Sequence, residues 1–173
     1  MSAPDLDTLD KAHLLAQAFA GVAEAELEEL AALTKVNTYP AGYLLCREGS
    51  YEDIFYILTA GEAIITKTIS PTEGERVLRQ VGAGDYVGEM ALIQNAPRAA
   101  SVRTLTDCTV LEIEKADFEA ILSRSPRLAL SIIRTTLNRM RANDQVAIHD
   151  LQRTNRILAQ LDRAAERFAA MLA

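Results

Sequence analysis

Between Lys35 and Lys115 the chain is a succession of short β-rich runs separated by glycines, and this spacing strongly constrains the fold. The runs are rich in Val, Ile, Thr and Tyr, and glycines at positions 42, 49, 61, 74, 82, 84 and 88 fall where strands must turn. Short strands at such intervals are typical of an all-β sandwich or barrel. The sequence therefore predicts a β domain over residues 35–125.

The segments on either side have helical periodicity. Residues 6–33 carry apolar side chains at helical spacing and predict an N-terminal helical lead-in over residues 1–34. After Lys115 a short helix is expected to end near Pro126, which can itself occupy the first turn of the next helix. The following 47 residues contain no Pro or Gly, so residues 126–173 predict one long helix. The expected fold class is α+β, mainly β.

The long helix also has a heptad pattern. Ten of twelve seam positions are apolar when a is placed at 137, 144, 151, 158, 165 and 172 and d at 133, 140, 147, 154, 161 and 168. Such a seam predicts a coiled coil, and we expect a parallel homodimer. The alternative, a helix folded back on its own domain, suits only the first two or three turns, because the whole helix would be about 70 Å long.

Charge and composition exclude several functional classes. Residues 1–126 hold 10 Lys/Arg and 20 Asp/Glu, a net charge of −10, which disfavours DNA binding; residues 127–173 hold 8 Arg and 4 Asp/Glu, a net charge of +4. No apolar stretch is long enough for a membrane span, and the acidic start does not resemble a signal peptide, so we expect a soluble, cytoplasmic chain. Cys46 and Cys108 are expected to be buried free thiols, and the scattered His13 and His149 indicate no metal site.

The segment from Gly88 to Val102, GEMALIQNAPRAASV, contains the groups needed to bind a phosphorylated sugar. A short helix beginning near Glu89 would offer unpaired N–H groups to an anion, and Arg98 adds a planar guanidinium. Gly88 permits a close backbone approach, and the Glu89 carboxylate could accept hydrogen bonds from ribose hydroxyls. The remaining candidate residues are Met90, Ala91 and Leu92 of the turn and the small Ala99, Ala100 and Ser101. The alternative is a purely structural ion pair between Glu89 and Arg98.

These residues resemble the phosphate-binding cassette of the cyclic nucleotide-binding domain family, in their Gly-Glu start, apolar turn and Pro-Arg-Ala-Ala-Ser-Val end. The resemblance implies a jelly-roll-like β-roll in which Glu89 binds the ribose 2′-hydroxyl and Arg98 the cyclic phosphate. Backbone groups around Ala91, Leu92 and Ala99 would complete the phosphate shell. Because receptors that prefer cGMP often have Thr where this chain has Ala99, the resemblance favours cAMP, with cGMP as the second ligand.

Asp144 interrupts the apolar seam of the long helix. By the family's pattern the helix after the roll covers the base, and Asn143 and Asp144 fall at the corresponding place. We therefore expect these two residues to read the adenine amine, and ligand binding to tighten the dimer. The alternative is that Asp144 only fixes the register of the seam, or lies where the seam is simply splayed apart.

The sequence thus predicts a cyclic nucleotide receptor that signals through a dimeric C-terminal helix to an unknown partner. Transcription factors of the catabolite activator branch carry a helix-turn-helix domain beyond this helix, and the chain stops before one, so no direct DNA binding is expected. Alternatives are the excised sensor of a larger signalling protein, or a sensor of cGMP or a cyclic dinucleotide. No triad, P-loop or metal-ligand spacing indicates an enzyme, and no cofactor is expected besides the nucleotide ligand.

Overall fold

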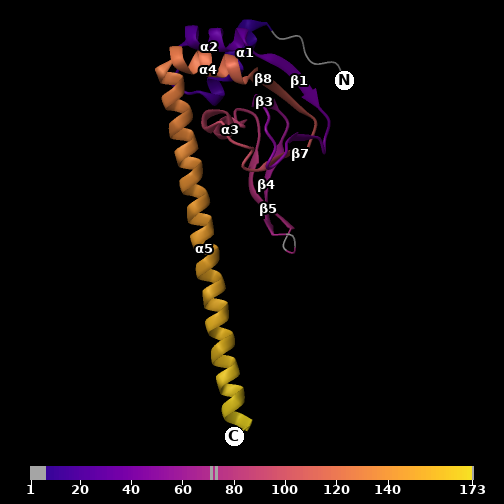
Figure 1. Cartoon of the computed structure of the whole chain (residues 1–173), viewed down its shortest axis with the longest axis vertical. Helices are drawn as coiled ribbons and strands as arrows, with labels where there is room; N and C mark the ends of the chain where they lie inside the picture. Colours follow the sequence, from indigo (N-terminus) through magenta and orange to yellow (C-terminus); the bar gives the residue numbers. More distant parts are fainter. Residues whose placement is uncertain (1–6, 71, 73, 173) are drawn as a thin grey trace. The chain divides into compact units, whose positions relative to one another are not determined.

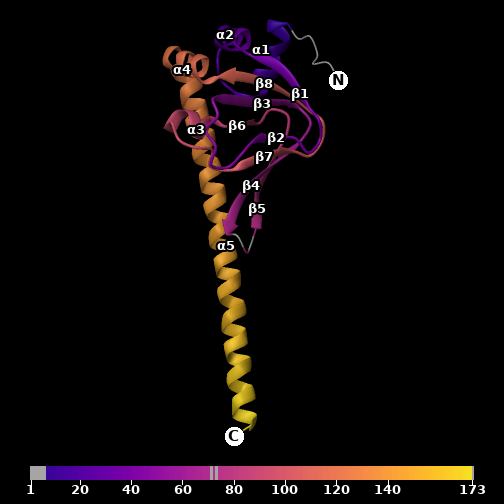
Figure 2. The ribbon, with the colours of Figure 1, turned by 45° about the vertical axis from the view of Figure 1, so that its right-hand side comes forward.

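The computed structural model describes residues 7–70, 72 and 74–172, with side chains at all of these except 9, 143, 146, 150, 162 and 164–172. The chain forms two units, residues 1–134 and residues 135–173, and the long C-terminal helix α5 contributes to both (Figures 1 and 2). The first unit contains every strand and four complete helices of the described chain. The predicted fold class, mainly β with flanking helices, is confirmed.

The predicted N-terminal lead-in consists of two helices, α1 (Thr8–Ala18) and α2 (Glu24–Ala32). Asp7 caps α1, since its carboxylate accepts a hydrogen bond from the Asp10 backbone N–H at 2.8 Å. The chain turns between the helices at Gly21, where φ is +83°. The inward sides of both helices are buried, at Leu15, Leu27 and Leu30 among others.

In the described part of the chain, eight strands form two four-stranded antiparallel sheets. One sheet has the order β1 (Lys35–Tyr39), β8 (Cys108–Glu114), β3 (Ile54–Ala60), β6 (Tyr86–Val87). The other has the order β2 (Leu44–Cys46), β7 (Ser101–Thr104), β4 (Ala63–Ser70), β5 (Gly74–Val81). Non-consecutive strands lie next to each other in both sheets, as in a jelly-roll-like β-roll.

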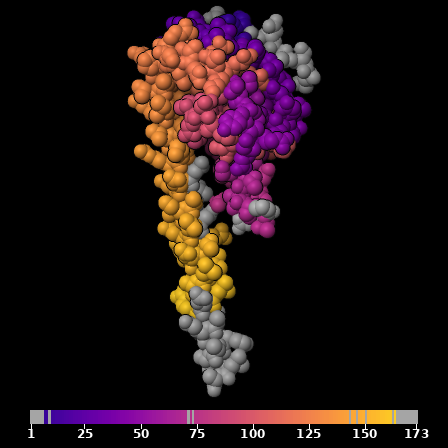
Figure 3. Space-filling view, in the orientation of Figure 1, coloured from indigo at the N-terminus to yellow at the C-terminus, as the bar shows by residue number. Residues whose placement is uncertain are grey.

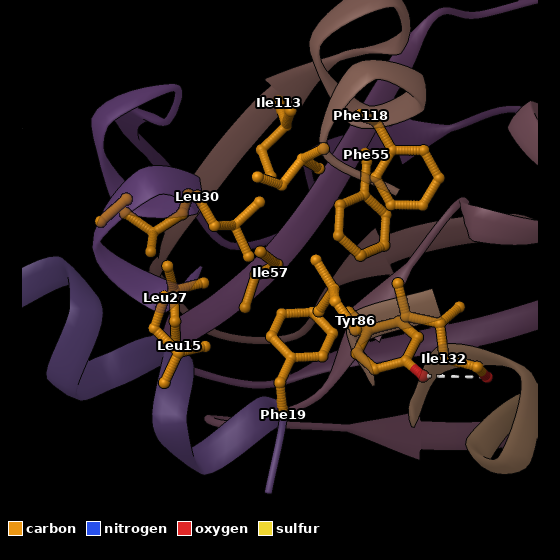
Figure 4. Close-up of a cluster of buried hydrophobic side chains, with 14 of the residues drawn as sticks. Leu15, Phe19, Leu27, Leu30, Phe55, Ile57, Tyr86, Ile113, Phe118 and Ile132 are labelled. Atoms are coloured by element: carbon orange, nitrogen blue, oxygen red, sulfur yellow. Dashed lines mark hydrogen bonds between the residues drawn. The ribbon is translucent and has the colours of Figure 1, made fainter. Parts of the chain in front are cut away.

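Alternate residues of the strands face two separate cores. On β3, Phe55 and Ile57 face a cluster shared with the helices, whereas Tyr56 and Leu58 face a cluster between the two sheets. Figure 4 shows the helix-side cluster, in which the rings of Phe55, Phe118 and Tyr86 lie close together. The helices are therefore fixed to one face of the β1-containing sheet by continuous apolar packing.

The C-terminal helices begin directly after β8. Helix α4 spans Lys115–Arg124, and α5 spans Pro126–Leu172, so Pro126 occupies the first turn of α5 as predicted. Leu128 and Ile132 of α5 are buried in the helix-side cluster of the first unit. Beyond Arg134 the described large apolar side chains of α5 are exposed: Leu137, Met140, Ile148, Leu151, Ile157, Leu158 and Leu161. The described part of α5 is coloured orange to yellow in the space-filling view of Figure 3. Among the described residues, no helix combines the length and apolarity needed to cross a membrane.

Candidate functional site

The cassette predicted from the sequence is a short helix held between two left-handed residues. Helix α3 spans Glu89–Gln94; Gly88 precedes it with φ +94° and Asn95 follows it with φ +51°. Asn adopts the left-handed conformation more readily than most residues. A Cβ on Gly88 would lie 2.3 Å from Arg98 Nη1 and 3.1 Å from the Ile54 carbonyl oxygen. Gly88 is thus required both by its conformation and by the close approach of the Arg98 side chain.

Arg98 is the buried cation of the cassette, with 3% of its surface exposed. Its Nη1 donates to the Gly88 carbonyl at 2.9 Å, its Nη2 donates to the Ile54 carbonyl, and its Nε donates to Glu52 Oε2 at 3.3 Å. Three of its five N–H groups are engaged by described residues, which leaves two that can donate to an anion. The guanidinium is therefore oriented by the roll itself.

The loop between β2 and β3 fixes the backbone of Arg98. The Arg98 N–H donates to the Ser50 carbonyl at 2.8 Å, and the Gly49 N–H donates to the Arg98 carbonyl at 2.8 Å. In the same loop Glu52 Oε1 accepts from the Ser50 hydroxyl at 2.6 Å and from the Arg47 N–H at 3.2 Å. This loop therefore positions both the main chain and the side chain of Arg98.

Glu89 directly follows Gly88, whose carbonyl accepts a hydrogen bond from Arg98 Nη1. Glu89 is 5% exposed at the first residue of α3. Burial raises the pKa of Cys46 to about 12; Arg98 opposes the shift, whereas the carboxylates of Glu52 and Glu89 add to it. Cys46 is thus a buried, protonated thiol beside the cassette, as the sequence predicted for a free cysteine.

The other predicted cassette residues line the turn and its exit. Ala91 and Leu92 are buried, Met90, Ala100 and Ser101 are partly exposed, and Ala99 is exposed. The Ser101 hydroxyl accepts a hydrogen bond from the Glu48 N–H at 3.0 Å. Leu92 belongs to the helix-side cluster, so the cassette is packed directly against the side chains that hold the helices.

The predicted base-reading residues belong to the second unit of the chain, whereas the cassette belongs to the first. Asp144 lies on α5 in the second unit and is exposed, and the Asn143 side chain is outside the described part of the chain. Their contact with a base stays a prediction. Within the described residues, no group of three or more His, Cys, Asp and Glu side chains could hold a metal ion.

Sequence reasoning missed the residues that position Arg98 from a distance. Glu52 and the Ile54 carbonyl are 46 and 44 positions away from Arg98 in the chain. The only sequence signal was an acid-bearing turn, GSYED, before a buried strand. From the sequence, Glu52 and Asp53 of that turn are equally good candidates to pair with Arg98. Only the fold shows that Glu52 forms the ion pair.

Comparison with known proteins assigns the family. The family model described as "Cyclic nucleotide-binding domain" matches residues 36–125, more than half of the chain. The chain belongs to the cyclic nucleotide-binding domain family. The match covers the roll, the cassette and α4. Members of this family are typically regulatory rather than catalytic.

Relatives in this family have several architectures. The chain is similar to a cyclic nucleotide-gated potassium channel of Rhizobium etli, with 32% identity over 121 residues that cover 70% of this chain and 32% of the channel. It is also similar to a cAMP-dependent protein kinase regulatory subunit of Emericella nidulans, with 35% identity over 57% of this chain and 26% of the subunit. The chain thus spans about a third or less of these curated relatives.

Solved structures agree with the cyclic nucleotide-binding fold. The catabolite activator protein of Thermus thermophilus superposes with a TM-score of 0.68 and 26% identity, over 75% of this chain and 60% of that one. The regulatory domain of Toxoplasma gondii PKA, crystallised with cAMP, superposes with a TM-score of 0.66 and 27% identity, over 73% of this chain and 48% of that one.

Proposed function

We propose that this chain is a cAMP receptor, in which Arg98 binds the cyclic phosphate and Glu89 the ribose 2′-hydroxyl. The observation that carries the proposal is the buried Arg98 guanidinium, which is fixed by three acceptors and retains two N–H groups for an anion. By resemblance to the family, the buried Glu89 carboxylate next to this anion site would accept hydrogen bonds from ligand hydroxyls. A ribose 3′,5′-cyclic phosphate has both kinds of group.

The preference for cAMP over cGMP rests on Ala99. By resemblance to the family, a Thr at this position would favour cGMP, and Ala lacks that hydroxyl. Asn143 and Asp144 would add a contact to the adenine amine from the long helix. cGMP and cyclic dinucleotides are the alternative ligands, because they present the same phosphate to Arg98.

The output of the receptor is proposed to pass through the helices. Leu92 of α3 packs in the cluster that also contains Phe118 of α4 and Leu128 of α5, so a ligand-induced shift of the cassette acts on the start of α5. We propose that α5 pairs with a second copy and transmits this change to a downstream partner in the cytoplasm. The same arrangement suits a sensor that is part of a longer signalling protein.

Calorimetric titration with cAMP, cGMP and a cyclic dinucleotide tests the receptor. We expect the wild type to bind cAMP most tightly, and Arg98→Ala to lower the affinity about 10- to 100-fold, since charge-assisted hydrogen bonds contribute about 1.5–3 kcal/mol. Arg103→Ala is the matched control, because Arg103 is an exposed arginine on β7 that donates to the Gly42 carbonyl. Failure of the wild type to bind any of the three ligands would contradict the proposal.

A further inference from the structure

A lysine reaches the cassette from the second sheet. Ile65 of β4 packs against the cluster between the sheets, and Lys67 lies two residues further along the same face of the strand. The Lys67 ammonium donates to the Ala99 carbonyl at 2.7 Å. Because Ala99 directly follows Arg98, a second cation is placed at the exit of the cassette.

Glu48 is the ion-pair partner of Lys67 at this position. Its Oε1 lies 3.5 Å from Lys67 Nζ, and its Oε2 accepts a hydrogen bond from the Thr68 N–H at 2.8 Å. The Thr68 backbone hydrogen bond holds the pKa of Glu48 below its ordinary value, so this carboxylate is ionised at neutral pH. The side chains are 46% exposed at Lys67 and 26% exposed at Glu48.

The charges around the cassette are unfavourable for an anion without Lys67. Glu89 is a buried carboxylate of the cassette, and Glu48 and Glu52 are the carboxylates paired with Lys67 and Arg98. Arg98 is already paired with Glu52. Removal of the Lys67 charge would leave the Glu48 carboxylate without its ion-pair partner at a site proposed to bind a phosphate.

We propose that Lys67 is a second cation of the nucleotide site and that it exchanges Glu48 for the ligand phosphate. The inference rests on the proposed function and assigns it a further ligand-binding residue. The 3.5 Å contact to Glu48 is the longer of the two Lys67 contacts, and the four-carbon side chain is partly exposed. After the exchange Glu48 keeps its hydrogen bond from Thr68 and its exposure to water.

If Lys67 binds the phosphate in this way, neutralising Lys67 and neutralising Glu48 should change the affinity for cAMP in opposite directions. Lys67→Gln keeps an N–H donor but loses the charge, and we expect it to weaken cAMP binding about three- to tenfold at low salt. Glu48→Gln removes the competing carboxylate, and we expect it to tighten cAMP binding. Lys67→Arg keeps the charge and should retain most of the affinity. The difference between wild type and Lys67→Gln should narrow as salt rises from about 20 to about 500 mM, since salt screens exposed charges.

The chain offers a matched control in the Lys35–Glu114 ion pair. This pair joins β1 to β8 at 2.7 Å, with side chains that are 71% and 59% exposed. Lys35→Gln and Glu114→Gln make the same changes in net charge, and we expect neither to alter the affinity for cAMP. If Lys35→Gln lowered the affinity for cAMP as much as Lys67→Gln does, only the net charge of the protein would matter, and the assignment of Lys67 would be overturned.

Calorimetric titration of these variants with cAMP, at both salt concentrations, separates the possible outcomes. Weaker cAMP binding by Lys67→Gln together with tighter cAMP binding by Glu48→Gln supports the exchange. If both substitutions weaken binding equally, the pair only holds Ala99 in place and the proposal is wrong; it is also wrong if both bind like the wild type. A wild type that binds no cyclic nucleotide would instead refute the proposed function, and this inference with it.

Discussion

At the scale of single residues, the site depends on a buried guanidinium whose charge is balanced before any ligand arrives. Arg98 is 3% exposed, and burial of a charge is costly unless it is paired and hydrogen-bonded. Glu52 supplies the opposite charge, and the Gly88 and Ile54 carbonyls supply acceptors. Two substitutions test this arrangement.

Glu52→Gln should lower the stability of the ligand-free protein and enlarge the stabilisation by cAMP. The substitution removes the charge that compensates Arg98, and breaking a buried ion pair costs up to about 3–5 kcal/mol. Glu52 is partly exposed, so we expect a loss of about 1–2 kcal/mol. The ligand phosphate replaces the missing charge, so the rise in Tm at saturating cAMP should exceed that of the wild type. An equal or smaller rise would argue against this compensation.

Gly88→Ala should abolish ligand binding as well as reduce stability. The new methyl group would lie 2.3 Å from Arg98 Nη1 and would displace the guanidinium. Gly42→Ala is the matched control, since Gly42 has φ +83° and nothing lies within 4 Å of its Cβ position. Both variants should lose about 1–2 kcal/mol from left-handed backbone strain, but only Gly88→Ala should lose cAMP binding in calorimetry. Normal binding by Gly88→Ala would mean that Arg98 is not held by the Gly88 turn.

At the scale of secondary-structure elements, the sequence predicted what depends on local pattern. The glycine spacing and β-rich runs predicted a β sandwich or barrel, which the family resemblance narrowed to a β-roll, and the short apolar run after Glu89 predicted α3. The loop that positions Arg98 was not predictable, because its hydrogen bonds join residues more than 40 positions apart. The Lys67–Ala99 contact was missed for the same reason, since it depends on the pairing of β4 with β7.

The junction between α2, α4 and α5 is a second contact that local pattern did not reveal. Ser125 is 2% exposed, and its hydroxyl caps α5 by accepting from the Leu128 N–H at 3.2 Å. The same hydroxyl donates to Glu26 Oε1 of α2 at 2.6 Å. One serine therefore joins the N-terminal helices to the start of the long helix, on the route proposed for the signal.

Ser125→Ala should make the free energy of unfolding vary less with pH in the acidic range. The Ser125 hydrogen bond, followed by one from the Ala23 N–H, holds the pKa of Glu26 below its ordinary value of 4.5. A lowered folded-state pKa contributes stability that is present above the unfolded-state pKa and lost as pH falls through the folded-state pKa. The free energies of unfolding of wild type and variant, measured by urea denaturation, should therefore differ most near pH 6–7 and less below about pH 4. At low pH the variant should still be less stable than the wild type by about 0.5–2 kcal/mol, because it lacks the helix cap.

Glu29→Gln provides the control for this pH dependence. Glu29 is an exposed residue on the same helix, 3.9 Å from Arg124, and such surface pairs contribute little. We expect its unfolding curve to follow the wild type at every pH. A constant difference between Ser125→Ala and wild type across the pH range would show that Glu26 is not linked to this junction.

At the scale of the whole molecule, the long helix α5 presents an exposed apolar face that a partner would cover. The exposed apolar residues of α5 beyond Arg134 largely follow the predicted seam, and Ile148 and Ile157 flank it. Most helical stability in proteins comes from packing of an apolar face, so this helix needs a partner in water. The heptad pattern predicted the seam and a parallel homodimer, and the homodimer stays a prediction, because the same apolar positions would suit a second copy or a different protein.

Leu151→Glu should prevent dimerisation, and Asp144→Leu should strengthen it. Leu151 is exposed at a seam position, so a charge there would be desolvated in a dimer. Asp144 places two like charges opposite each other in a parallel pair, and Leu would replace them with apolar contact. Gln152→Glu introduces the same charge next to Leu151 but off the seam, and should leave the dimer intact. Sedimentation equilibrium of the full chain measures the dimerisation of the wild type and of these three variants. A dimer with a micromolar dissociation constant would form at about 100 μM. A wild type that stays monomeric at this concentration would instead assign the seam to a different protein.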